Sequence, residues 1–398
     1  MPVYENLELL NAPPSRASRV RARLMRSVAK IVRIWPAPPP ELLSAMRILV
    51  IRPDHLGDML FLGPAMRWLR QRLPTAHIAL AMGPWARPAL PACHETYDEL
   101  IEIPFPAFER RKRRGMLGRW RLFSPWAQKL GAGRYDAALI CRPDHWWGAA
   151  LTRFAGIPLR LGFDTLETTP WLTTALPMRN EHAAASNLRL VASLTHDTLS
   201  LESNAHPLHF DLNARNLGYA DALLYNIFGT HEPQPLAIIH PGSGAAIKLW
   251  DVAKWREIAM RLTQNGLRVL VTGGPNERNL TRDVASVAAG GVIDLGGETS
   301  FSLLAGLMAR AQIVLGPDSG PLHLAVAMGA STVHLYGPSN PTTFGPWGDS
   351  SRHRIIRSNW ECAPCDKFDW PDPQRHNCVR DIDVEAVWEV TQQLLQYI

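Results

Sequence analysis

Short apolar runs alternate with amphipathic stretches along most of the chain. In the first half, the pattern predicts a strand at Arg47–Ile51, a polar loop that contains glycine, a helix from about Asp58 to Leu73, and a strand at His77–Met82. A helix that connects two strands in this way returns the chain to the same edge of the sheet, so the strands run parallel. The apolar run at Asp136–Cys141 predicts a further strand of this sheet.

The second half repeats this pattern with nearly the same spacing. A strand at Leu236–His240 is followed by a glycine loop, a helix at about Asp251–Gln264 and a strand at Leu267–Thr272. The paired strands start 30 residues apart in the first half (47 to 77) and 31 apart in the second (236 to 267). Further strands are expected at Val292–Leu295, Ile313–Leu315 and Thr332–Tyr336, and further helices at Phe301–Ala309, Gly320–Met328 and about Val384–Tyr397, the last with Asp383 as its N-cap.

These two repeats predict an α/β protein with two Rossmann-like parallel-sheet domains. The polar, proline-containing segment Gly229–Pro235 is the expected junction. We expect an extension at residues 1–45, a first domain at 46–230, a second at 234–383 and a C-terminal helix at 384–398. Because doubly wound domains bind ligands at the carboxyl ends of their strands, a ligand cleft is expected between two facing domains.

Positive charge is concentrated in two segments. Residues 16–33 and residues 110–121 each hold seven Arg or Lys and no acid, so the rest of the chain carries 28 basic and 36 acidic residues. The first segment predicts a helix from Arg16 to about Trp35 with a basic and an apolar face, which suits the surface of an anionic membrane. Packing on the body of the protein, or disorder, is the alternative for this helix.

Composition also bounds the location of the protein. No apolar run reaches the roughly 18 residues of a membrane-spanning helix, and the N-terminus lacks the pattern of a secretory signal. Five cysteines in 398 residues do not form a disulfide framework, which fits a reducing compartment. We therefore expect a cytoplasmic protein, held at the inner face of the inner membrane by its N-terminal helix.

One loop of the second half is suited to binding an anion. A strand is expected to end at Leu315 and a helix to begin at Ser319 or Gly320, where free backbone N–H groups and the helix dipole attract negative charge. Asp318 would repel a phosphate, so it fits better as an acceptor for sugar or ribose hydroxyls. It could equally be the N-cap of the helix.

A second glycine loop follows the strand at Leu236–His240. Gly242 and Gly244 permit close approach to the backbone, Ser243 supplies a hydroxyl, and Lys248 could neutralise a diphosphate leaving group. An ordinary surface lysine before a helix is the alternative for Lys248.

Two carboxylates lie at other predicted strand ends. Glu277 follows the Gly-Gly turn after the strand at Leu267–Thr272. Asp58 lies at the start of the first predicted helix, where it could accept a proton from a hydroxyl or cap the helix. Spacing alone favours the cap.

Together these stretches resemble the bacterial lipopolysaccharide heptosyltransferases. The resemblance is carried by RPDHLGDMLFLGPAMRWLRQRLP, FAGIPLRLGFD, HPGSGAAIKLWDVAKWREIAMRL, VTGGPNERNL and VLGPDSGPLHLAVAMGASTVHLYGPSNP, in this order. It implies the GT-B architecture, inverting transfer without a metal, a donor that is usually ADP-heptose, and an acceptor in the inner core of lipopolysaccharide. Other nucleotide sugars are used by related proteins, so the donor stays open.

The resemblance also implies roles for individual residues. It makes Asp58 the catalytic base and places Lys248 on the donor phosphates. It makes Glu277 a ribose-binding acid and Thr299 a contact to the donor base. The remaining donor-binding residues that it implies are His240, Gly242, Ser243, Gly244, Asp318, Ser319, Gly320 and His323.

The basic segment at 110–121 favours an anionic acceptor, which Arg111, Arg113 and Arg114 would bind through bidentate contacts. This segment counts against the alternative of a GT-B epimerase or hydrolase, which needs no lipid-anchored acceptor. Neither basic segment has the interleaved aromatic residues of a nucleic-acid module, so no nucleic acid is expected. Three cysteines, Cys362, Cys365 and Cys378, could bind zinc with His376, but a fourth ligand is uncertain, so no metal or other cofactor is assigned.

Overall fold

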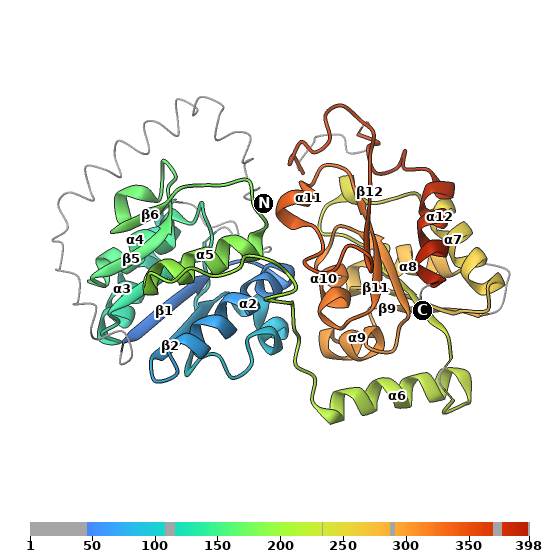
Figure 1. Ribbon diagram of the computed structural model, residues 1–398, viewed down its shortest axis with the longest axis horizontal. Helices are drawn as coiled ribbons and strands as arrows, with labels where there is room; N and C mark the ends of the chain where they lie inside the picture. The colour runs from blue at the N-terminus through green and yellow to red at the C-terminus, as the bar shows by residue number, and fades with distance from the viewer. Residues whose placement is uncertain are drawn as a thin grey trace. The chain divides into compact units, whose positions relative to one another are not determined.

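The computed structural model describes residues 46–106, 108, 116–232, 234–286, 291–368 and 376–396. Its contacts divide the chain into two compact units, Met1–Glu202 and Ser203–Ile398. Each unit contains one six-stranded sheet with helices packed against it (Figure 1). The expected extension at 1–45 and the acceptor arginines Arg111, Arg113 and Arg114 lie outside the described residues.

The first sheet has the strand order β3-β2-β1-β4-β5-β6, and all its strand pairs are parallel. In β1 and β2 the register pairs Arg47 with His77 and Arg52 with Met82. The strands are β1 (Arg47–Arg52), β2 (His77–Met82), β3 (Glu99–Glu102), β4 (Ala137–Ile140), β5 (Leu159–Phe163) and β6 (Thr174–Leu176).

The helices of this unit pack in two groups. One group brings α2 against α5 and the 3-10 helix η3, and the other brings α3 against α4. Apart from Arg52 in β1 and Arg160 in β5, the buried strand residues are apolar on both faces, as expected for a parallel sheet covered on both sides. The helices are α2 (Leu56–Arg72), η3 (Pro84–Cys93), α3 (Met116–Ala132), α4 (Trp146–Phe154), η4 (Thr169–Trp171) and α5 (Ala183–Thr195).

The second sheet has the corresponding order, β12-β11-β10-β7-β8-β9, and is also parallel throughout. The strands are β7 (Leu236–Ile239), β8 (Arg268–Gly273), β9 (Val292–Gly296), β10 (Ile313–Pro317), β11 (Ser331–Tyr336) and β12 (His353–Arg357). The helices are α6 (Ala214–Phe228), η5 (Ala246–Lys248), α7 (Val252–Gln264), η6 (Pro275–Glu277), α8 (Arg278–Ala285), α9 (Phe301–Met308), α10 (Gly320–Ala327), α11 (Pro341–Phe344) and α12 (Val384–Leu395).

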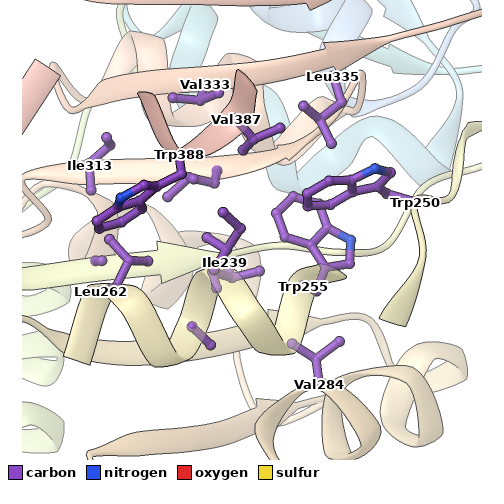
Figure 2. Packing of buried hydrophobic residues seen from close by; sticks show 14 of the residues in the cluster. Ile239, Trp250, Trp255, Leu262, Val284, Ile313, Val333, Leu335, Val387 and Trp388 are labelled. Carbon is purple, nitrogen blue, oxygen red and sulfur yellow. The ribbon is translucent and has the colours of Figure 1, made fainter. Parts of the chain in front are cut away.

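A core that contains several tryptophans packs against one face of this second sheet. Figure 2 shows Trp255 and Leu262 of α7 and Val387 and Trp388 of α12 gathered around Ile239 of β7. The Asp383 side chain accepts a hydrogen bond from the Glu385 N–H and caps α12, as the sequence predicts. The C-terminal helix is therefore part of the second core.

The boundary between the units differs from the expected one at residues 230–234. The α6 helix, expected in the first domain, packs on α9 of the second unit, and Arg310 forms an ion pair with Asp221 at 2.7 Å. These contacts move the boundary to Glu202–Ser203.

In the part of the chain that the structure describes, no helix is long and apolar enough to cross a membrane.

Candidate active site

The turn between β10 and α10 is built for close backbone approach. Strand β10 ends at Pro317, and Ser319 occupies the N-cap position of α10 in an extended conformation. A Cβ on Gly316 would lie 2.6 Å from the carbonyl oxygen of His240, so only glycine lets these two chain segments meet. The N–H groups at the start of α10 therefore lie next to the loop that follows β7.

Asp318 is the centre of a buried polar cluster in this turn. Its Oδ2 lies 2.6 Å from Lys248 Nζ, and its Oδ1 accepts a 3.3 Å hydrogen bond from the Tyr336 hydroxyl. His323 Nε2 lies 3.5 Å from the same Oδ1. Burial alone would raise the pKa of Asp318, but Lys248 and His323 hold it well below its usual range. The N-cap interpretation of Asp318 is wrong, because Ser319 takes that position.

Two serine hydroxyls lie beside this cluster. Ser243 Oγ donates to the Asp318 carbonyl at 3.4 Å. Ser319 Oγ is buried and has no hydrogen-bond partner among the described residues. A buried hydroxyl without a partner costs stability unless a ligand satisfies it. Together with the backbone N–H of Gly320, the first residue of α10, it forms a pair of donors suited to an anionic oxygen.

Lys248 is not an ordinary surface lysine. It ends η5, its side chain is only 17% exposed, and its ammonium lies 4.5 Å from the centroid of the Phe368 ring. The Asp318 carboxylate and the Phe368 ring hold the ammonium at the donor turn. Gly244, which precedes η5, is exposed.

Glu277 belongs to the same group of loops. Its Oε2 accepts a 2.7 Å hydrogen bond from the Gly274 N–H, and a Cβ on Gly242 would overlap its carboxylate. His240 Nδ1 lies 3.1 Å from Thr272 Oγ1, and its Nε2 lies 4.0 Å from Glu277 Oε2. Burial lowers the pKa of His240 to about 4, so this imidazole is neutral at pH 7 and its contact with Glu277 is not an ion pair.

Thr299 lies half-buried in the loop between β9 and α9. A cavity of about 380 Å³ lies beside this loop and is lined by α6 together with Leu295, Glu298 and Ser300. Thr299 therefore follows the carboxyl end of β9, the strand that pairs with β8.

Asp58 lies in the first turn of α2, in the first unit. The N-cap of α2 is His55, because the helix begins at Leu56, two residues before the expected start. The Asp58 carboxylate instead accepts a 3.0 Å hydrogen bond from Arg52 Nη2, and its side chain is 20% exposed. The N-cap interpretation of Asp58 is thus wrong, and its role as the base remains a prediction.

Sequence reasoning missed several residues that contact the predicted ones. Tyr336 reaches Asp318 from the end of the neighbouring strand, and Arg52, Asp54 and Arg142 form ion pairs behind Asp58. A signal for the arginines was present in the sequence, because Arg-Pro-Asp-His at residues 52–55 recurs at residues 142–145. No comparable signal identified Tyr336.

Two of the cysteines considered as zinc ligands differ in exposure. Cys378 is buried, and burial raises the pKa of its thiol to about 11, whereas Cys362 is exposed. Within the described ranges, no group of three or more His, Cys, Asp or Glu side chains is placed to hold a metal ion.

Comparisons with known proteins identify relatives that match most of the chain. The family model described as "Glycosyltransferase family 9 (heptosyltransferase)" matches residues 124–372. Over 323 residues the chain is 28% identical to lipopolysaccharide heptosyltransferase 2 of Escherichia coli strain K12, covering 78% of this chain and 88% of that protein.

Solved structures show the same fold. The glycosyl transferase family 9 structure from Veillonella parvula DSM 2008 matches with a TM-score of 0.71 at 22% identity, covering 89% of this chain and 99% of the other. The E. coli ADP-heptose LPS heptosyltransferase II structure matches with a TM-score of 0.66 at 23% identity, covering 88% and 99%. These matches confirm the expected GT-B fold class.

Proposed function

This chain belongs to glycosyltransferase family 9, the heptosyltransferases, and from that premise we propose that it transfers heptose from ADP-heptose to the inner core of lipopolysaccharide with inversion at the anomeric carbon. The relatives named as lipopolysaccharide heptosyltransferases support the sugar and the acceptor. The similarity of the fold to E. coli ADP-heptose LPS heptosyltransferase II supports the donor.

One observation carries the donor side of this proposal. Three loops follow the adjacent strands β10, β7 and β8, and they bring Asp318, Lys248 and Glu277 to one edge of the second sheet. Ligands of doubly wound domains bind at this edge. The unsatisfied Ser319 hydroxyl and the Gly320 N–H at the start of α10 suit the diphosphate, and the Glu277 carboxylate suits the ribose hydroxyls.

Lys248 forms an ion pair with Asp318. We propose that donor binding draws the ammonium toward the diphosphate, so that Asp318 becomes available to accept hydrogen bonds from sugar hydroxyls. His323 and Tyr336 remain in contact with Asp318 and keep its carboxylate in place during this exchange.

The chemistry is a single displacement. An acceptor hydroxyl oxygen forms a bond to the anomeric carbon while the bond from that carbon to the diphosphate oxygen breaks. The hydroxyl proton passes to the Asp58 carboxylate, and ADP leaves with the additional negative charge. Lys248 and the N–H groups at the Ser319–Gly320 turn stabilise that charge.

Two further proposals concern segments outside the described residues. Arg111, Arg113 and Arg114 would bind phosphates or carboxylates of the acceptor, and the basic helix predicted from the sequence at residues 16–35 would hold the enzyme at an anionic membrane surface. Their support is the concentration of positive charge in these segments.

The test is a transfer assay with purified protein, ADP-heptose and lipopolysaccharide from a strain that lacks core heptose. We expect the acceptor to gain the mass of one heptose for each ADP released, and proton coupling constants of the product to show the inverted anomer. ADP release without a mass gain would indicate a hydrolase, and transfer of another nucleotide sugar in preference to ADP-heptose would contradict the donor assignment.

A further inference from the structure

A chain of five alternating charges runs through the first unit behind Asp58. Arg52 Nη2 contacts Asp58 Oδ1 at 3.0 Å, and Arg52 Nε lies 2.8 Å from Asp54 Oδ2. Asp54 Oδ1 forms a second ion pair with Arg142, whose Nε lies 2.5 Å from Asp144. The order of charges is therefore Asp58, Arg52, Asp54, Arg142, Asp144.

The middle of this chain is buried and its two ends are accessible. The side chains of Arg52 and Arg142 are each 3% exposed and that of Asp54 is 1% exposed. Asp58 is 20% exposed at one end and Asp144 is 47% exposed at the other. Burial of charge is costly unless each group is paired, so the three middle groups hold one another in fixed positions.

The fold explains why the network forms. Strands β1 and β4 are adjacent and parallel, with Ile51 paired to Ile140, so their carboxyl ends lie side by side. Each strand leads into the same tetrapeptide, Arg-Pro-Asp-His, at residues 52–55 and 142–145. The arginine of each copy binds the aspartate of its own copy, and Arg142 also crosses to Asp54 of the other.

Arg52 is fixed on its remaining side as well. Its Nη1 donates to the Cys141 carbonyl and lies 3.4 Å from Asn187 Oδ1, while Asn187 Nδ2 donates to the Phe61 carbonyl of α2 at 3.1 Å. The planar guanidinium thus has a separate partner for each of its nitrogens, in an arrangement that a lysine ammonium cannot reproduce.

We propose that Arg52 is the positioning residue of Asp58, and that the paired Arg-Pro-Asp-His turns fix Arg52 so that the Asp58 carboxylate faces the acceptor hydroxyl. The inference rests on the proposed role of Asp58 as the base. Arg52 holds one carboxylate oxygen, Oδ1, and so sets the plane in which the other oxygen meets the hydroxyl. Asp54 shares the positive charge of Arg52, because it forms an ion pair with the same guanidinium.

A double-mutant cycle tests this role. Arg52→Lys keeps the charge but loses the planar fork, so kcat should fall by about 10²-fold, as a misplacement of about 1 Å can do. The KM values for donor and acceptor should stay within about twofold. In an Asp58→Asn background the same Arg52→Lys change should lower the residual rate by less than about twofold, because nothing remains to be positioned.

The controls separate positioning from general damage. Arg72→Lys likewise replaces a planar guanidinium by an ammonium, but at an exposed ion pair with Asp197, and it should leave kcat unchanged. If Arg52→Lys does not fold, Asp144→Asn at the exposed end of the chain takes its place. It should lower kcat about threefold in the wild-type background only, because it frees Arg142 from one partner.

Each outcome decides a different question. Equal falls in both backgrounds, or a fall confined to KM, would overturn the positioning role of Arg52 while leaving Asp58 as the base. Near-normal turnover of Asp58→Asn alone would remove both the base and the positioning role. A circular dichroism spectrum and a melting temperature close to wild type are required of each variant in the cycle.

Discussion

Replacing Lys248 by methionine should reduce both the stability of the protein and its affinity for the donor. The change removes the positive partner of Asp318 but keeps most of the apolar stem that lies against Phe368. Asp318 then remains buried with His323 and Tyr336 as its contacts. Loss of one partner of a buried ion pair costs about 3–5 kcal/mol. Because Lys248 is 17% exposed and water can enter its place, we expect about 3 kcal/mol.

The loss should depend on pH in a defined direction. The folded-state pKa of Asp318 is lowered, so its contribution to wild-type stability is present above the unfolded pKa of about 3.9 and is lost as the pH falls through the folded pKa. In Lys248→Met the buried carboxylate can relieve its cost by taking up a proton. The difference in unfolding free energy between wild type and variant should therefore shrink between pH 7 and pH 4.

Two measurements check this prediction. Urea unfolding followed by tryptophan fluorescence gives the stability difference at each pH, and calorimetric titration with ADP gives the affinity. A charge-assisted hydrogen bond contributes about 1.5–3 kcal/mol, so Kd should rise by roughly 10- to 100-fold. The double variant Lys248→Met/Asp318→Asn should recover most of the stability but not the ADP affinity.

Lys254→Met is the matched control, since Lys254 Nζ donates only to carbonyls, those of Arg380 and Ile382, in the contacts that the structure gives. It should leave the affinity for ADP unchanged. A stability loss in Lys248→Met that is constant across pH, together with unchanged ADP binding, would refute the assignment of Lys248 as both the counterion of Asp318 and a donor contact.

Three other changes test the glycine loop after β7, the acceptor arginines and the N-terminal segment. Gly242→Ala should lower the free energy of unfolding by about 1–3 kcal/mol and weaken ADP binding, because the new Cβ would displace the Glu277 carboxylate. Gly218→Ala on α6, where a Cβ has open space, should instead raise the free energy of unfolding by about 0.5–1 kcal/mol. Replacing Arg111, Arg113 and Arg114 by glutamine should raise the acceptor KM and flatten its salt dependence, and an effect on the donor KM alone would show that these residues serve the donor. Deleting residues 1–45 should abolish co-sedimentation with anionic liposomes but preserve activity on a soluble acceptor, and equal sedimentation of both forms would reject membrane binding by this segment.

The sequence predicts every inner strand except β5, because the predicted strands are continuous apolar runs whereas β5 contains Arg160. β2 has the bounds expected for it, and β1, β7, β8 and β10 differ from expectation by only one or two residues at an end. Edge strands such as β6 and β12 were missed, since they are short or mix polar with apolar residues. The boundary was misplaced because the packing of α6 on α9 joins segments that are far apart in sequence.

The candidate site could also be predicted only in part from the sequence. Glycine loops at strand ends located Lys248, Glu277 and Asp318 correctly at one edge of a sheet. Spacing could not decide whether Asp58 and Asp318 were helix caps, because a shift of one or two residues in the helix start changes the answer. Their actual partners, Arg52 and Tyr336, are brought in by folding.

Single-turnover kinetics of Asp58→Asn show whether Asp58 is the catalytic base. Asparagine keeps the size of the side chain and can still accept from Arg52, but it has lost the basicity of the carboxylate. With ADP-heptose and acceptor both bound at wild-type affinity, we expect the rate of heptose transfer to fall by about 10²–10⁴-fold. A near-normal transfer rate in Asp58→Asn would contradict the assignment of Asp58 as the base.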